Sequence, residues 1–414
     1  RIRRYTHTCN NSITIPSFFS NRYRDEKKML QVIAAIFIVI FFIPYTASGF
    51  AACGKLFSSL FGVKYLTAMI ISAIVIVAYT TLGGFLAAST TDFIQSIIMS
   101  VALIVVLIFG VETAGGIGAA IHNASELPGY LSMTLSYDVN TGKATPYSAL
   151  TIVSTAAWGL GYFGMPHILL RFMAIEDEKK LKLSRRVATI WVVISLFVAV
   201  FIGVIGYTMS KVGALEMLTG SNSETIIVKI SALLSQHGVI FALLAGVILA
   251  GILASTMSTS DSQLLAASSA VSSDILGAFR KDSSNKNGSM AAARITLLVI
   301  SVVAAFIARN PDSSVFAIVS FAWAGFGAAF GPVVLFSLFW KRTNKWGALA
   351  GMVCGGSMVF IWKYLIRPLG GIWNIYELLP AFLIACAAIV IVSLLTPKPS
   401  KEIEEEFDRV AQMK

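Results

Sequence analysis

Long runs of apolar residues dominate the chain and are separated by short polar segments. A helix needs about 20 residues to cross roughly 30 Å of hydrocarbon, and ten runs reach or approach that length. In lipid, a spanning segment must satisfy its own backbone hydrogen bonds, so each run is predicted to be a helix. The expected spans are residues 29–53, 64–87, 91–112, 148–173, 186–210, 237–272, 291–309, 315–340, 345–367 and 374–396. The pattern therefore predicts an all-α membrane protein.

Helix-breaking residues interrupt two of these runs. The fourth contains Gly159, Gly161, Gly164 and Pro166, and the eighth contains Gly325, Gly327, Gly331 and Pro332. Broken helices in membranes free backbone groups that can line a transport path, whereas glycines can also simply allow close helix packing. At the fourth run Trp158, Tyr162 and His167 cluster at the break, which favours a binding function. At the eighth run the two interpretations remain equally open.

Hydroxyl groups form a stripe within the sixth run. Ser255, Ser258, Thr259 and Ser262 recur at the spacing that places side chains on one helix face. Oxygen ligands of this kind suit a hard cation. Serine and threonine in membrane helices also back-bond to carbonyls or line helix contacts, so the stripe by itself indicates either packing or an ion site.

Acidic residues are scarce inside the apolar runs, and Asp92, Asp261 and Glu112 therefore stand out. Glu112 is expected to reach water. Asp92 begins its span on the cytoplasmic side, where an acid ordinarily complements the helix dipole. Asp261 follows the hydroxyl stripe and either tunes an ion path or faces a hydrated vestibule.

Composition supports the membrane assignment and charge gives an orientation. The chain is 56% hydrophobic and 13% charged, with a mean hydropathy of +0.78, far from the soluble average of about 25% charged residues. The net charge of +11 does not indicate nucleic acid, because about three quarters of the 32 basic residues fall in one set of loops. The positive-inside rule places these loops, and both chain ends, in the cytoplasm. The predicted organisation is a cytoplasmic loop at 1–28, a transmembrane domain at 29–396 and a cytoplasmic tail at 397–414, in the inner (plasma) membrane.

Signatures of enzymes are missing from the sequence. The four cysteines and four histidines show no metal-ligand spacing, and no nucleotide loop, kinase signature or nucleophile elbow occurs. We therefore expect a protein that is not an enzyme. Residue 1 is Arg and no signal peptide is visible, so the chain is expected to be a fragment that lacks an upstream part.

Several segments resemble the sodium/solute symporter family, most closely its proline branch. They include NNSITIPSFFSNRY (10–23), YTTLGGFLAASTTDFIQ (79–95), WGLGYFGMPHILLRFMA (158–174), ILASTMSTSDSQLL (252–265), FAWAGFGAAFGPVVLF (321–336) and IYELLPAF (375–382). The resemblance implies a LeuT-type fold of two inverted five-helix repeats. About ten of an expected thirteen transmembrane helices would be present, with the second repeat at about 148–340.

The same resemblance implies roles for individual residues. Sodium would bind the hydroxyls of Ser258 and Thr259 and the backbone carbonyl of Ser255. Substrate would lie near Tyr45, Trp158 and Tyr162, with Pro166 marking the unwound turn, and Asp92 and Asp261 would lie on the ion path. Met165, Phe321 and Asp261 depart from the pattern of the proline branch and leave the substrate less sharply defined.

The implied function is sodium-coupled import of L-proline by alternating access. The expected partners are sodium, a small-molecule substrate and the lipid bilayer, and nucleic acid is not expected. Two alternatives stay open: a sodium symporter for another solute, such as pantothenate, another amino acid or a sugar, and the membrane sensor domain of a signalling protein.

Overall fold

The computed structural model describes residues 1–279 and 286–413, without the side chains of residues 79, 83–89 and 286–289. Arg280, Lys281 and the last tail residue, Lys414, lie outside the described residues. Within the described part, nine helices are long and apolar enough to cross a membrane. They are Met29–Phe61, Tyr65–Leu82, Thr90–Thr113, Glu178–Lys211, Val239–Phe279, Met290–Ile307, Val315–Phe339, Lys345–Leu369 and Leu378–Leu395. The predicted all-α architecture is confirmed, and the tenth expected span, 148–173, is the interrupted one.

The elements follow one another in a simple order. The first half contains α1 (Ile2–Thr8), α2 (Ile15–Arg22), α3 (Met29–Phe61), α4 (Tyr65–Thr113), α5 (Ile117–Ser125), β1 (Leu135–Asp138), β2 (Lys143–Pro146), α6 (Ala149–Ala156), η1 (Ala157–Phe163), α7 (Pro166–Ala174), η2 (Glu178–Lys180) and α8 (Leu181–Lys211). The second half contains η3 (Gly220–Thr225), α9 (Ile226–Leu234), η4 (Ser235–His237), α10 (Val239–Ser269), η5 (Ala270–Ile275), α11 (Leu276–Phe279), α12 (Lys286–Ile307), α13 (Val315–Phe339), α14 (Lys345–Ile361), η6 (Trp362–Ile366), η7 (Arg367–Leu369), η8 (Gly371–Trp373), α15 (Leu378–Leu395) and α16 (Lys401–Gln412).

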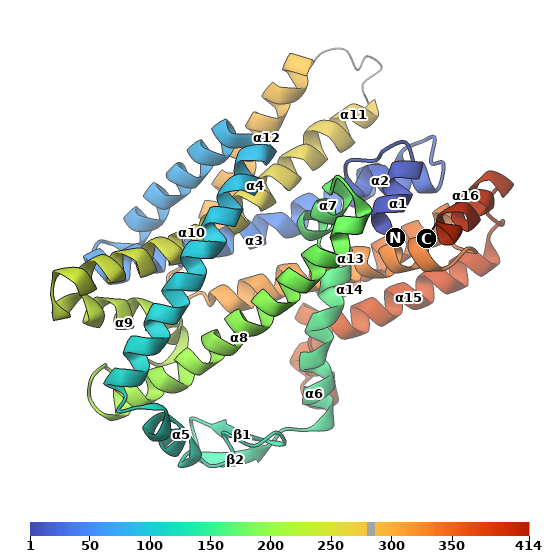
Figure 1. Cartoon of the computed structure of the whole chain (residues 1–414). Helices are drawn as coiled ribbons and strands as arrows, with labels where there is room; N and C mark the ends of the chain where they lie inside the picture. The colour runs from blue at the N-terminus through green and yellow to red at the C-terminus, as the bar shows by residue number, and fades with distance from the viewer. Residues whose placement is uncertain (280–285, 414) are drawn as a thin grey trace.

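The helix α4 contains two of the expected spans. Its apolar stretches, Tyr65–Leu82 and Thr90–Thr113, run in opposite directions in Figure 1. The second stretch packs closely on α10, because Gly251 leaves room for Ala102: a Cβ built on Gly251 would lie 2.9 Å from the Ala102 methyl. This contact places the start of the second stretch, which carries Asp92, beside the hydroxyl-rich part of α10.

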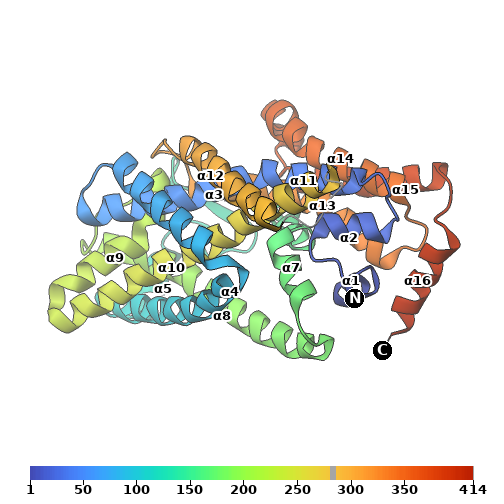
Figure 2. The same ribbon diagram turned by 90° about the horizontal axis from the view of Figure 1, so that it is seen from above.

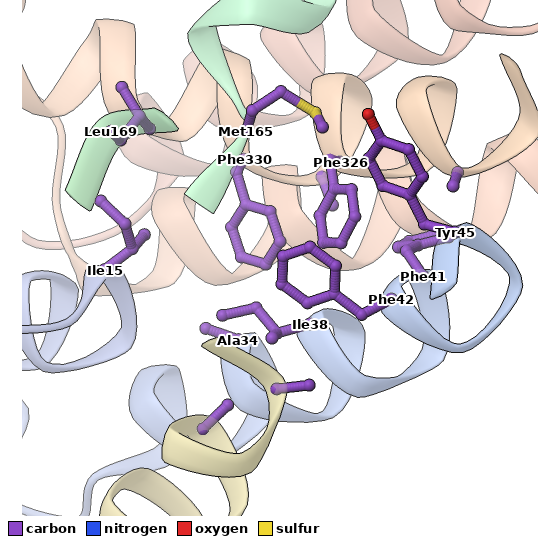
Figure 3. Packing of buried hydrophobic residues seen from close by; sticks show 14 of the residues in the cluster. Ile15, Ala34, Ile38, Phe41, Phe42, Tyr45, Met165, Leu169, Phe326 and Phe330 are labelled. Atoms are coloured by element: carbon purple, nitrogen blue, oxygen red, sulfur yellow. The ribbon is translucent and has the colours of Figure 1, made fainter. Parts of the chain in front are cut away.

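Among the described helices long enough to cross a membrane, α13 is the most buried, and it packs against α3, α14, α15 and the interrupted segment. Every residue from Phe321 to Val334 is buried. Figure 3 shows a layer of rings between α3 and α13, in which Phe42 lies 4.5 Å from Phe326 and Phe41 lies 5.7 Å from it, measured between ring centroids. Offset and tilted ring pairs of this kind bury much apolar area and hold helices in a defined register.

The two chain ends lie next to each other (Figures 1 and 2), because the terminal helix α16 docks on α1. Glu406 of α16 accepts a hydrogen bond from the Cys9 thiol at 2.7 Å and pairs with Arg24. Burial and the neighbouring Glu406 carboxylate raise the pKa of Cys9, so the thiol stays protonated. The segment 1–28, expected as a loop, thus contains two short helices, and the tail is a docked helix.

Away from the termini, a second polar cluster joins three elements. Glu224 of η3 accepts hydrogen bonds from Lys55 at the end of α3 and from Ser314, the N-cap of α13. It also accepts from the backbone N–H groups of Val315 and Phe316. A carboxylate at a helix N-terminus satisfies donors that have no partner within the helix.

Candidate functional site

The fourth apolar run is interrupted, as the sequence predicts. It divides into α6, the 3-10 segment η1 and α7, with Met165 in an extended conformation directly before Pro166. A residue that precedes proline is driven out of the helical region, and proline is well tolerated at the first position of the next helix. Pro166 therefore ends one helical segment and begins another, which confirms the predicted break.

The eighth run behaves differently, because α13 continues without a break from Val315 to Phe339 and contains Pro332. Glycines on both segments allow their backbones to lie in close contact. A Cβ on Gly164 of the interrupted segment would lie 2.2 Å from the Phe326 carbonyl oxygen of α13, and one on Gly327 of α13 would lie 2.8 Å from Gly161 Cα. Of the two readings of this run, the structure supports close packing.

Aromatic side chains surround the break. Trp323 of α13 donates its indole N–H to the Trp158 carbonyl at 2.9 Å, an acceptor that the break frees from the helix ladder. Trp158 stacks on Trp323 at 5.3 Å, and Tyr162 meets Trp323 edge-on at 4.8 Å. The structure thus brings two predicted substrate residues together around Trp323, which the sequence alone did not single out.

Tyr45 joins this region from the opposite side. It follows Pro44 inside α3, is 8% exposed, and packs edge-on against His167 at 6.0 Å, one residue beyond Pro166. Figure 3 shows Tyr45 and Met165 on either side of the ring of Phe326. Tyr162, in contrast, is 49% exposed, so the predicted substrate residues include both a covered and an open aromatic ring.

The hydroxyl stripe lies on α10 as a partly exposed face. The Ser258 and Thr259 hydroxyls both donate to the Ser255 carbonyl, at 3.0 and 3.1 Å. This is the back-bonding expected of serine and threonine in membrane helices. Because each hydroxyl uses its hydrogen in this bond, its lone pairs point away from the carbonyl and remain available to a cation.

A charged cluster lies one turn further along α10. Arg171 of α7 pairs with Asp92 of α4 at 2.5 Å and donates to the Ser262 hydroxyl at 3.0 Å. Asp261 is fully buried, and neither of its carboxylate oxygens has a hydrogen bond of normal geometry. Of the two alternatives for Asp261, the hydrated vestibule is therefore wrong, because helix packing encloses the side chain.

A cavity of about 810 Å³ opens beside this cluster on the side of the chain termini. Its wall includes Thr14 from the segment before α2, His167 and Arg171 from α7, Ser262 from α10 and Ser272 from η5. The cavity therefore connects the break in the fourth run, the end of the hydroxyl stripe and the outside of the protein.

Arg171 was missed by sequence reasoning, which counted it only among loop charges. The available signal was an arginine at the end of an apolar run, where a buried or partly buried charge needs a partner. Among the described residues, no group of three or more histidine, cysteine, aspartate or glutamate side chains could hold a metal ion. The oxygen-rich face of α10 is a different kind of site, built from hydroxyls and carbonyls.

An interrupted membrane helix beside a hydroxyl-bearing helix, with a cavity reaching both, is typical of secondary transporters. Comparisons with known proteins give the family. A model of the sodium:solute symporter family matches residues 2–355, and the chain belongs to that family. It is accordingly a multi-pass membrane protein.

Several similar proteins match nearly the whole chain. The "High-affinity proline transporter PutP" of Bacillus subtilis is 40% identical over 99% of this chain and 82% of the relative. The "Osmoregulated proline transporter OpuE" of the same organism is 38% identical over 97% of this chain and 78% of the relative. A "Sodium/proline symporter" of Haemophilus influenzae is 40% identical over 99% of this chain and 79% of the relative.

A solved structure shows the same fold. It is a Na⁺-coupled sialic acid symporter in a substrate-bound outward-open state, with a TM-score of 0.72 and 16% sequence identity over 94% of this chain and 78% of that chain. The predicted LeuT-type transporter fold is confirmed by this similarity.

Proposed function

We propose that the protein imports L-proline together with sodium by alternating access across the plasma membrane. The observation that carries the proposal is the interrupted segment α6–η1–α7, which lies beside the hydroxyl face of α10 and opens into the same cavity. The names of the relatives, which are proline transporters and sodium/proline symporters, supply the substrate and the ion. Transport by conformational change requires no chemical catalysis, so the protein is not an enzyme.

Sodium would bind on α10 between the hydroxyl oxygens of Ser258 and Thr259 and the carbonyl of Ser255. Both hydroxyls already donate to that carbonyl, so the three oxygens lie close together and their remaining lone pairs can face one ion. Oxygen ligands are the preference of hard cations. A few neutral oxygens compete with water only where the site is partly dry, as on this partly exposed helix face.

Proline would bind where the helix is interrupted, near Pro166. Unpaired backbone groups at a break can hold the carboxylate and the amine of a zwitterion, and Tyr45 and Tyr162 would enclose the apolar ring. Trp158 has rings stacked on it from Trp323 and Phe316, at 5.3 and 5.6 Å. Its proposed role is therefore to shape the substrate site through this stack.

The ion path would lead from α10 past Asp261 and Asp92 into the cavity. We propose that this cavity faces the cytoplasm, because the side on which it opens carries both chain ends and the basic loops. Residues 1–28 and 397–414 would then be cytoplasmic and residues 29–396 would form the transport domain. The second repeat would cover about 148–340.

The sodium gradient supplies enough free energy for concentrative uptake. One cation crossing 100 mV contributes about 2.3 kcal/mol, and a tenfold sodium gradient adds about 1.4 kcal/mol. Coupling one ion to one proline therefore supports about 500-fold accumulation. By linkage, sodium and proline would raise each other's affinity by the same factor.

The substitution Thr259→Ala tests the ion site directly. It removes one proposed ligand, so the sodium concentration for half-maximal proline uptake should rise by about tenfold or more. The rate of uptake at saturating sodium should change less. The matched control is Thr256→Ala, which removes a hydroxyl from the same helix that bonds to the Ile252 carbonyl instead. An equal sodium requirement in the wild type and the Thr259 variant would refute the ligand role.

Competition identifies the substrate. Sodium-driven uptake of labelled proline should be suppressed by excess unlabelled proline and resist excess pantothenate, sugars and larger amino acids. Uptake of another solute that excess proline leaves unchanged would instead support the alternative, a symporter with a different substrate.

A further inference from the structure

Arg171 connects three helices that must separate or approach during transport. Its guanidinium reaches from α7, the second half of the interrupted segment, to Asp92 on α4 and Ser262 on α10. The arginine side chain is 45% exposed and lies in the cavity wall, whereas Asp92 is 13% exposed. The positive charge therefore approaches the carboxylate from the cavity side.

Several buried oxygen atoms beside this contact lack a hydrogen bond of normal geometry. The second carboxylate oxygen of Asp92, both oxygens of Asp261 and the side-chain oxygen of Gln95 on α4 are buried without a hydrogen bond of normal geometry. The neighbouring groups Asp92, Arg171 and Ser262 are joined to one another by the guanidinium contacts. A cluster of this composition attracts a cation, because buried carboxylates are stable only when they are paired or neutralised.

A sodium ion and the guanidinium would use the same oxygens. The Asp92 carboxylate and the Ser262 hydroxyl, which accept from Arg171, are both oxygen ligands of the type that a sodium ion prefers. Two positive charges cannot occupy these oxygens together without strong repulsion. Occupation by Arg171 and occupation by sodium are therefore mutually exclusive.

We propose that Arg171 acts as a tethered cation that replaces sodium at Asp92 and Ser262 when the ion leaves for the cavity. This inference rests on the proposed function as a sodium symporter. Because Arg171 belongs to α7, the guanidinium is delivered or withdrawn as the interrupted segment moves. Arg171 is thus a positioning residue that favours release of sodium and opposes its return from the cavity.

The proposed role predicts an effect on transport rates that depends on whether sodium must leave the protein on the cavity side. Without the guanidinium, sodium on the cavity side would rebind to Asp92 more readily. Net uptake into sodium-free vesicles, which requires release of the ion, should slow. Exchange of internal for external proline at high sodium on both sides, which does not require the ion to leave, should be affected much less.

The experiment compares Arg171→Gln and Arg171→Lys with the wild-type protein in proteoliposomes. In Arg171→Gln, net uptake should fall several times more than exchange, and the internal sodium concentration that halves uptake should fall by about fivefold or more. The Arg171→Lys variant keeps the positive charge, so its net uptake and its inhibition by internal sodium should both stay close to those of the wild type. Arg185→Gln is the matched control, since this exposed arginine of α8 lies outside the cavity wall.

A double-mutant cycle distinguishes the proposed role of Arg171 from a general defect in folding or transport. In the background of Asp92→Asn, the further change Arg171→Gln should leave the inhibition by internal sodium unchanged, because the shared carboxylate is gone and the Ser262 hydroxyl alone carries no charge to attract either cation. Parallel loss of net uptake and exchange with unaltered inhibition by internal sodium would overturn the inference alone. Wild-type uptake that does not depend on sodium would overturn the proposed function, and this inference with it.

Discussion

At the scale of single residues, the site combines satisfied and unsatisfied polar groups on one helix. The hydroxyls of Ser258 and Thr259 have a backbone acceptor, whereas the carboxylate of Asp261, only two residues further, is buried and has no donor of normal geometry. Leaving a buried polar group unpaired costs about 1–3 kcal/mol. Such a cost is commonly retained where a ligand satisfies the group during function.

Asp261→Asn tests whether this carboxylate faces the ion. A ligand that binds only the folded state stabilises it by mass action, so sodium should raise the Tm of the wild-type protein in detergent relative to potassium. Removing the negative charge should reduce that sodium-specific increase by about half or more, as read from intrinsic tryptophan fluorescence. The exposed Asp312→Asn is the control. A sodium-specific increase of undiminished size in Asp261→Asn would exclude Asp261 from the ion path.

At the scale of elements, the interrupted segment and α13 form one unit. Glycines on both sides permit backbone contact, and Gly161 faces the indole of Trp323, whose N–H holds the Trp158 carbonyl. The break is therefore stabilised from outside, by a neighbouring helix. A 3-10 segment has poorer hydrogen bonds than an α-helix, which makes this support necessary.

Gly161→Ala should disturb that unit, because the new methyl carbon would lie 1.9 Å from Trp323 Nε1. Overpacking of this kind costs about 1–3 kcal/mol, so we expect a lower Tm and a loss of proline binding. Gly159→Ala is the matched control, since nothing lies within 4 Å of a Cβ at that position. Equal thermal stability of the two variants would show that the close contact with α13 is unimportant.

At the scale of the whole molecule, polar clusters at opposite ends hold the helices together. Near the termini Glu406 of α16 binds Cys9 and Arg24, which lie just beyond the ends of α1 and α2. At the other end Glu224 of η3 binds Lys55 of α3 and Ser314, the N-cap of α13. Burial alone would raise the pKa of Glu224, but hydrogen bonds from Lys55, Ser314 and the two backbone N–H groups outweigh it, so the pKa lies below its ordinary value.

Glu224→Gln tests this second cluster through its dependence on pH. A carboxyl group with a lowered pKa stabilises the folded state above its unfolded pKa of about 4.3 and loses that contribution as the pH falls through the folded value. The variant should therefore have a lower Tm than the wild type at pH 7, and the difference should shrink as the pH falls below about 5. Glu216→Gln, which removes an exposed ion pair with Lys229, should change Tm little at any pH. A wild-type advantage that stays constant down to pH 4 would contradict the role of the charge.

The sequence could predict features that depend on local chemistry. Length and hydropathy suffice for the number of spans, because each membrane helix must satisfy its own backbone. The break at Pro166 was equally predictable, since glycine and proline act on their own backbone. The glycines of the eighth run show the limit of this reasoning: the same residue types served packing in α13, and only the helix that approaches them decides which role applies.

The sequence by itself determined the membrane class, the interrupted fourth run, the hydroxyl stripe of Ser255, Ser258 and Thr259, and, through its motifs, the family. Only the tertiary structure decided that Asp261 is enclosed, that Trp323 supports the break, and that Arg171 meets Asp92 and Ser262 across three helices. The physical reason is the range of the interactions. Periodicity and backbone propensity act within a few residues, whereas burial and charge pairing depend on helices that are distant in the chain and adjacent only after folding.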